Sequence, residues 1–253
     1  PSDDSGTTSV WGRLSTPDAA LLHQAIGSLI HGVCDDDPRT LAQRRADAVG
    51  ALATSTDLQY FEKQGVIVPQ LKYEEFIHLA ESKGHINEKY RRYNGPDSML
   101  NKFDEKLLVW DKNVIFFPRR IDGKLYFLHR IKPDIQIVCV HDLQELTKEF
   151  WENYFLHFHE HILLEPKHRH EVSYIGGGCP PIETEQGWLL IYHGVHDTPA
   201  GYRYVACAAL LDLNDPSREL ARLPYALFSP EYDYELTGEV NNVCFPTGTS
   251  LFG

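Results

Sequence analysis

The 253-residue sequence lacks several features, and each absence excludes a class of protein. No apolar run approaches the roughly 18 residues that a membrane-spanning helix needs, so we expect no membrane partner. Positive charge is scarce, with 24 basic residues against 36 acidic ones and a net charge of -12. A protein that binds nucleic acid nonspecifically needs a basic face to displace counterions, so we expect no nucleic acid partner either.

Cysteine is also scarce. The five cysteines are scattered and form no CxxC pair, which argues against a disulfide framework and favours a reducing compartment. Several histidines lie between residues 157 and 170, but they lack HExxH spacing and cysteine partners. We therefore expect exposed loop and strand positions for them and no metal site. No basic-then-apolar segment opens the chain, so a cytoplasmic location is the expectation.

The composition of the chain changes near residue 54. Residues 1–56 contain neither lysine nor glutamate, whereas residues 57–253 contain both and hold nearly all the aromatic residues. Capping residues followed by apolar residues at helical spacing predict two helices in the first part. We expect an α-helical segment at 1–54 and a second domain at 55–253, and we interpret the chain as a chimera of two sequence fragments.

A repeat of roughly 65 residues runs through the second part. Pro118, Pro181 and Pro246 each stand near the start of a unit, and turn signals followed by apolar strands come after them. Four short strands per unit at this period predict blades of a β-propeller, so the expected fold class is mainly β. The expected whole blades span 105–170 and 171–231, the partial blades span 51–69 and 240–253, and a helical insertion spans 70–100.

Specific motifs lie in the second of these units and beyond it. Residues 175–182 read Ile-Gly-Gly-Gly-Cys-Pro-Pro-Ile, and residues 187–195 read Gly-Trp-Leu-Leu-Ile-Tyr-His-Gly-Val. With these motifs and the stretch 234–246, residues 51–253 resemble glycoside hydrolase family 130. Residues 8–54 resemble domain of unknown function 222, a family often found ahead of HNH endonuclease modules, although no HNH motif follows here.

The first resemblance implies a five-bladed propeller, of which this chain would hold two whole blades and two partial ones. It also implies an inverting enzyme that cleaves β-mannosidic bonds of a mannose-containing oligosaccharide, with water or with inorganic phosphate. The family's proton donor, an aspartate of the first blade, would lie upstream of residue 51, where the other family's helices stand. Loss of such an acid costs roughly 10²–10⁴-fold in rate, so we expect this chain to be inactive. Without closure a propeller exposes unpaired strand edges, so we also expect marginal stability.

The resemblance further implies binding residues. Arg130 and His193 match the cluster that holds phosphate in the phosphorylases, and Gly177 and Gly178 belong to the glycine run beside it. The lysine of that cluster is replaced here by Tyr174. Because charge-assisted hydrogen bonds hold phosphate, the lost cation modestly favours hydrolysis. Phosphorolysis is the alternative, with inorganic phosphate as a co-substrate, and no cofactor is expected in either case.

A hydrolase of this kind needs a carboxylate base that activates water. Glu235 and Glu239 are the candidate bases, and Glu171 is a further one. Simpler interpretations stay open at this point: Glu235 as a surface ion pair, Arg130 in a buried salt bridge and His193 as a core histidine. A non-catalytic sugar-binding module is the alternative from another functional class.

Overall fold

The computed structural model describes residues 67–69, 71–84, 86–94, 108–199, 201–238 and 240–249. Contacts within the chain divide it into two units, Pro1–Ile67 and Val68–Gly253, and the described residues belong almost entirely to the second. The helices predicted for residues 1–54 lie outside the described residues, as does most of the partial blade predicted for 51–69. The fold below is that of the second unit.

The first of two antiparallel sheets holds four strands in chain order. They are β1 (Lys112–Phe116), β2 (Leu125–Arg130), β3 (Ile135–Val140) and β4 (Ile162–Leu164). An Asp-Gly pair joins β1 to β2, and both of its residues, Asp122 and Gly123, have the positive φ angles (49° and 74°) that a tight hairpin turn requires. The turn predicted from these residues is therefore present.

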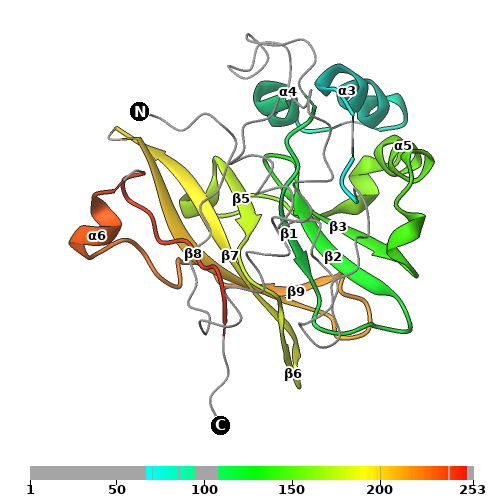
Figure 1. The fold of residues 1–253 in the computed structure, drawn as a ribbon. Coiled ribbons are helices and arrows are strands. Elements are labelled where there is room, and N and C mark those ends of the chain that lie inside the picture. Colours follow the sequence, from blue (N-terminus) through cyan, green and yellow to red (C-terminus); the bar gives the residue numbers. More distant parts are fainter. Residues whose placement is uncertain are drawn as a thin grey trace, which may run out of the picture. The chain divides into compact units, whose positions relative to one another are not determined.

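The second sheet has the order β5-β7-β8-β9, and β6 pairs with β7 beside this path. Its strands are β5 (Tyr174–Gly177), β6 (Ile182–Thr184), β7 (Gly187–Thr198), β8 (Gly201–Leu211) and β9 (Glu219–Arg222). The fold is thus mainly β with antiparallel sheets (Figure 1). The two sheets fall within the two predicted whole blades, but their membership of a five-bladed propeller stays a prediction.

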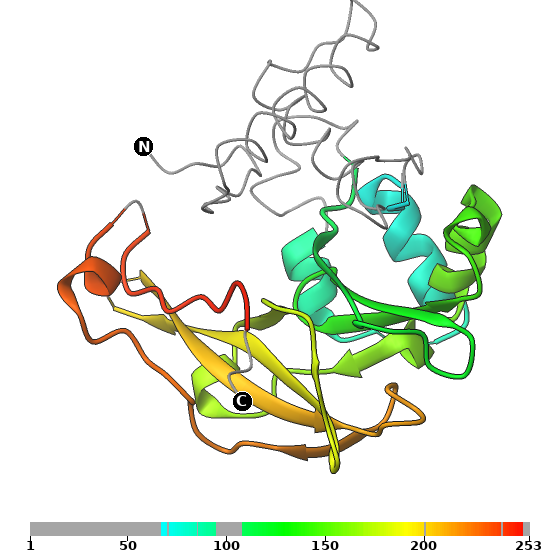
Figure 2. The same ribbon diagram turned by 60° about the horizontal axis from the view of Figure 1, so that its bottom comes forward.

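The described helices are short. They are α3 (Tyr73–Ser82), α4 (Glu88–Asn94), α5 (Lys148–Leu156) and α6 (Asp233–Leu236), with 3-10 turns at Leu143–Glu145, Phe158–His161 and Arg169–Glu171. Helices α3 and α4 lie within the predicted insertion, and α3 packs beside both α4 and α5 (Figure 2). None of these described helices has the length and apolar character needed to cross a membrane.

Aromatic side chains join the helices to one another. The fully buried ring of Phe76 in α3 meets Phe155 of α5 edge-on at 5.3 Å and Phe158 at 5.2 Å. Tyr90 of α4 contacts Phe158 in the same way. Such pairs add to the free energy gained from burial itself, so the helices of the predicted insertion are part of the packed core.

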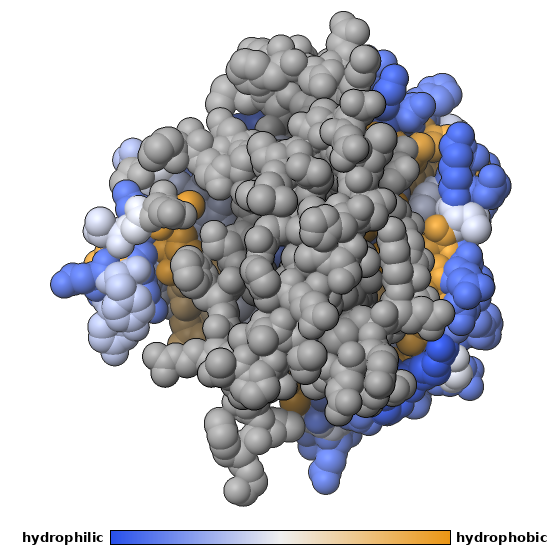
Figure 3. All heavy atoms as spheres, in the orientation of Figure 1, coloured by the Kyte–Doolittle hydropathy of each residue, from blue (hydrophilic) through white to orange (hydrophobic). Residues whose placement is uncertain are grey.

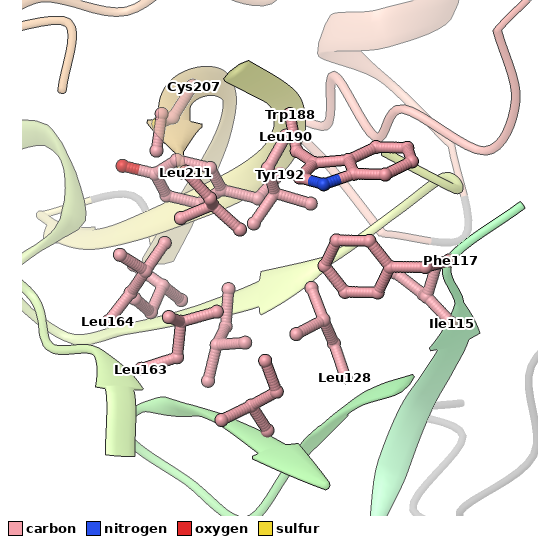
Figure 4. Close-up of a cluster of buried hydrophobic side chains, with 14 of the residues drawn as sticks. Ile115, Phe117, Leu128, Leu163, Leu164, Trp188, Leu190, Tyr192, Cys207 and Leu211 are labelled. Carbon is pink, nitrogen blue, oxygen red and sulfur yellow. The ribbon is translucent and has the colours of Figure 1, made fainter. Parts of the chain in front are cut away.

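A hydrophobic core fills the space between the two sheets. Figure 4 shows side chains of β1, β2 and β4 pointing toward those of β7 and β8. Trp188 is fully buried, and its ring meets Phe117 edge-on at 5.2 Å. Each large apolar side chain buried here stabilises the fold by about 1.5–3 kcal/mol. Where atoms of described residues are visible in Figure 3, hydrophilic residues dominate, with smaller hydrophobic areas between them.

Candidate functional site

Strand β5 brings the predicted binding residues together, because it contacts strands of both sheets. It pairs with β7 in its own sheet and also packs against β1, β2 and β3 (Figure 1). The backbone N–H of Ile175 donates to the carbonyl of Pro133 at 2.9 Å, and Nδ2 of Asn113 donates to the carbonyl of Gly177 at 3.0 Å. The end of β2, the start of β5 and the middle of β7 therefore meet at one place.

Arg130 and His193 lie in contact at this junction. Arg130 is 7% exposed and His193 is fully buried, and 3.4 Å separates Arg130 Nη1 from His193 Nε2. A guanidinium only donates, so Nε2 accepts and the imidazole proton sits on Nδ1. Burial, together with the charges of Arg130 and Lys132, holds the pKa of His193 well below its usual value. His193 is therefore neutral near pH 7.

The glycine run lets the strands approach closely. A Cβ on Gly176 would lie 2.6 Å from His193 Cε1 and 3.0 Å from Arg130 Cδ. The side chains of His193 and Arg130 therefore occupy the space that a side chain at position 176 would need. A Cβ on Gly177 would lie 2.2 Å from Ile115 Cδ1. A Cβ on Gly178 would lie 2.0 Å from the carbonyl oxygen of Pro246. The glycines thus shape the site through their lack of side chains.

Tyr174 is buried and faces two cations. Its hydroxyl shares a 2.5 Å hydrogen bond with Tyr204, and burial raises the pKa of Tyr174 well above its usual range. The guanidinium of Arg130 lies 5.3 Å from the centre of its ring. Nζ of Lys132 lies closer, 3.9 Å from the same centre. Cations are attracted to the faces of aromatic rings at such distances.

Lys132 is the residue that the motif comparison missed. It lies two positions beyond Arg130, in the turn between β2 and β3, and it matches no residue of the predicted cluster. Burial, then the charges of Arg130 and Lys112, lower its pKa to about 7. The sequence offered one sign of its role: two cationic residues, Arg130 and Lys132, stand two positions apart just before Pro133. We call Arg130, Lys132, Tyr174 and His193 the Arg130 cluster.

The charges of this cluster are unbalanced. In the part of the chain that the structure describes, neither Arg130 nor Lys132 forms an ion pair with a carboxylate. Asp111 acts on Arg130 only through space, and its Oδ1 pairs with His129 at 2.9 Å. Among the described residues, Arg130 Nε and His193 Nδ1 are buried and have no hydrogen-bond partner. Buried charge is costly when unpaired, so the cluster is suited to bind an anion.

The candidate bases lie apart from this cluster. Oε2 of Glu235 accepts hydrogen bonds from the backbone N–H groups of Glu231 and Tyr232, which caps α6 and lowers the pKa of Glu235. Glu171 is fully buried, where it accepts from the hydroxyl of Tyr192 and pairs with Arg222. Glu239 lies outside the described residues. The assignment of any of these glutamates as a base stays a prediction.

Two other places in the described part of the chain have features of a ligand site. Ligand atoms of His170, Glu171 and Cys207 lie within 4.8 Å of one another, as metal ligands can. However, the carboxylate of Glu171 is already held by Tyr192 and by the cation Arg222, and burial raises the pKa of the Cys207 thiol to about 12. A groove of about 510 Å³ lies beside β4 and β9, and no residue of the Arg130 cluster lines it.

Comparison with known sequences gives two separate matches. The sequence model of glycoside hydrolase family 130, described as β-1,4-mannooligosaccharide phosphorylase, matches residues 78–252. The model of domain of unknown function 222 matches residues 1–62. The family-130 match covers Arg130, Tyr174, Gly177, Gly178 and His193, which are the residues that the resemblance singled out.

Curated relatives of the larger part are phosphorylases by name. A β-1,2-mannobiose phosphorylase of Listeria innocua is 39% identical over 54% of this chain and 37% of the relative. A 1,2-β-oligomannan phosphorylase of Thermoanaerobacter is 35% identical over 64% of this chain and 51% of the relative. The solved structure of the Listeria innocua enzyme with β-1,2-mannobiose aligns with a TM-score of 0.47 and 35% identity, covering 58% of this chain and 40% of that one.

Proposed function

This chain belongs to glycoside hydrolase family 130, and we propose that it forms part of an enzyme that cleaves β-mannosidic bonds with inorganic phosphate. The substrate would be a mannose-containing oligosaccharide. The chain spans 37% and 51% of the length of the two curated relatives. For this chain the proposal therefore concerns the phosphate site of such an enzyme.

One observation carries the choice of phosphate over water as the acceptor. Arg130 is buried beside the neutral His193, and among the described residues no carboxylate forms an ion pair with it, although Asp111 acts on it through space. Arginine is well suited to hold phosphate, because its donors match two phosphate oxygens at once. The expectation that hydrolysis is favoured rested on the missing lysine at position 174. The relatives named above are phosphorylases, so the alternative reaction is the better supported one.

The proposed reaction needs no carboxylate base. An oxygen of phosphate forms the bond to the anomeric carbon while the bond to the glycosidic oxygen breaks, and inversion yields α-mannose 1-phosphate. The leaving oxygen takes a proton from a general acid, which the family resemblance assigns to an aspartate of the first blade. Phosphate replaces the water that a base would have to activate. The capping role of Glu235 in α6 is compatible with this scheme.

The test uses the full chain and 4-nitrophenyl β-mannoside, whose leaving group departs without protonation. The expected inactivity concerns substrates whose leaving group needs the missing acid. With this activated substrate we expect release of 4-nitrophenol to rise with phosphate concentration and saturate, with mannose 1-phosphate as the product. Arg130→Met should abolish the phosphate dependence. Arg169→Met is the matched control, because Arg169 is exposed and lies outside the cluster.

Two results would contradict the proposal. Release that is independent of phosphate and yields free mannose would indicate hydrolysis. Saturable binding of mannobiose without any release, at every phosphate concentration, would indicate the non-catalytic sugar-binding module.

A further inference from the structure

We propose that Lys132 supplies the cation that position 174 lacks, so that the anion site is completed from the turn between β2 and β3. This inference rests on the proposed function, since it assigns one more residue to the same phosphate site. It also changes the meaning of Tyr174. The ring of Tyr174 then supports a cation from the turn between β2 and β3, and the tyrosine does not mark a lost charge.

The position of Lys132 follows from how its turn is fixed. Its backbone carbonyl accepts a hydrogen bond from Nδ2 of the buried Asn94 at 2.8 Å. The side chain of Gln136 bonds both backbone groups of the preceding residue, Ile131, at 2.7 and 3.0 Å. Pro133 accepts from the backbone of β5. Hydrogen bonds from α4, β3 and β5 therefore hold the turn, and they fix the backbone position of Lys132.

The side chain then runs over the ring of Tyr174. Its Nζ lies 3.9 Å from the centre of that ring and 5.7 Å from the centre of the Tyr93 ring. Tyr174 is held in turn by its hydroxyl contact with Tyr204, and Tyr93 is held by the hydrogen bond from its hydroxyl to the carbonyl of Ser173. Two fixed aromatic rings thus direct the ammonium group without neutralising it.

The surroundings of Lys132 add positive charge and no described counter-charge. The charges of Arg130 and Lys112 both act on it, and both disfavour its protonated form. Its other titratable neighbours are His193, which is neutral, and the tyrosines Tyr93 and Tyr174, whose pKa values are raised. A bound dianion would reverse this balance, because it attracts both cations at once. A dianion therefore stabilises the protonated form of Lys132 and the charge of Arg130 more than a monoanion would.

The first experiment measures binding of inorganic phosphate to the full chain by titration calorimetry. Lys132→Met keeps most of the side-chain length and removes the charge, and it should weaken phosphate binding by about 10-fold to 100-fold. Lys132→Arg should stay within a few-fold of the wild type. Lys148→Met is the matched control, because Lys148 lies exposed on α5, and it should bind phosphate as the wild type does.

The second experiment keeps a cationic side chain at position 132 in both proteins and varies the pH. Sulfate stays a dianion between pH 6 and 9, so any change in its affinity over this range reports the protein. We expect wild-type affinity for sulfate to fall as the pH rises and Lys132 loses its proton, and we expect Lys132→Arg to remove most of that fall. A role of Lys132 in folding alone would give no such difference between the two proteins.

The outcomes separate the two proposals. If the wild type binds phosphate and Lys132→Met binds it equally well, the role of Lys132 is wrong while the phosphate site stands. If the wild type binds neither phosphate nor sulfate, the proposed function fails and the inference fails with it.

Discussion

At the scale of single residues, the site is defined by positive charge that forms no ion pair with any described carboxylate. The motifs predicted Arg130, Tyr174 and His193, and the structure brings these three together. Lys132 could not be predicted in the same way. Its place beside Tyr174 depends on how the turn after β2 packs against β5, which no local pattern encodes. The proposal that Lys132 replaces the cation lost at position 174 therefore rests on the packing of this turn and not on a sequence motif.

The glycine at position 176 gives a prediction at this scale. Gly176→Ala places a methyl group 2.6 Å from Cε1 of His193 and 3.0 Å from Cδ of Arg130. Both side chains must move, so we expect phosphate affinity to fall at least about 10-fold, measured by titration calorimetry. Gly248→Ala is the control, because its methyl group would meet no atom of the described residues within 4 Å. Equal affinities for the two variants would contradict the prediction.

A buried acid gives a second prediction, on stability. Asp134 is 1% exposed, and burial raises its pKa to about 7 although Tyr90 donates a hydrogen bond to it at 2.5 Å. Glu165 raises this pKa further, and Lys89 and Arg222 lower it. Between pH 4 and 7 the folded state keeps a proton that the unfolded state releases. As the pH rises through this range, the free energy of unfolding should therefore fall by up to about 1.4 kcal/mol per pH unit.

Urea unfolding at several pH values checks this account. Asp134→Asn cannot ionise, so its free energy of unfolding should lack this part of the decline with pH. The difference between the two proteins isolates the contribution of one carboxyl group. Parallel pH profiles for wild type and variant would show that Asp134 does not titrate in this way.

At the scale of elements, strands were easier to predict than helices. The hairpin at Asp122–Gly123 and the apolar strand of β7 follow from turn residues and apolar runs. Helix α5 was missed, although Thr147 caps it by accepting from the N–H of Phe150. Its aromatic residues fit a strand as well as a helix, and packing against α3 decides between them. The packing of strand β5 could not be predicted from local sequence either, because its contacts with the first sheet involve residues far apart in the chain.

The packing of the inserted helices can be tested directly. Phe76→Ala removes a ring that contacts α4 and α5, and we expect it to lower the free energy of unfolding by about 3–5 kcal/mol in urea titrations. His78→Ala on the exposed face of α3 is the control and should change it by less than about 0.5 kcal/mol. A loss below about 1 kcal/mol for Phe76→Ala would mean that the helices are peripheral.

At the scale of the whole molecule, composition predicted two parts, and contacts divide the chain into two units. The predicted boundary followed residue 54, whereas the units meet after Ile67. Composition marks where one sequence type gives way to another, but the limit of a packed unit depends on contacts that the sequence does not display. The family-130 match begins at residue 78 and the other match ends at residue 62, and the domain bounds 1–54 and 55–253 stay a prediction. That the two parts form a chimera, and that the sheets are propeller blades, stay predictions.

A crystal structure of the full chain grown with inorganic phosphate tests the central claim most directly. The account predicts a phosphate ion whose oxygens lie within hydrogen-bond distance of Arg130 and Lys132, beside His193. A carboxylate of the chain itself paired with Arg130, with no phosphate at the cluster, would contradict it. In that case the cluster would be a structural ion pair and the family's reaction would have no phosphate site here.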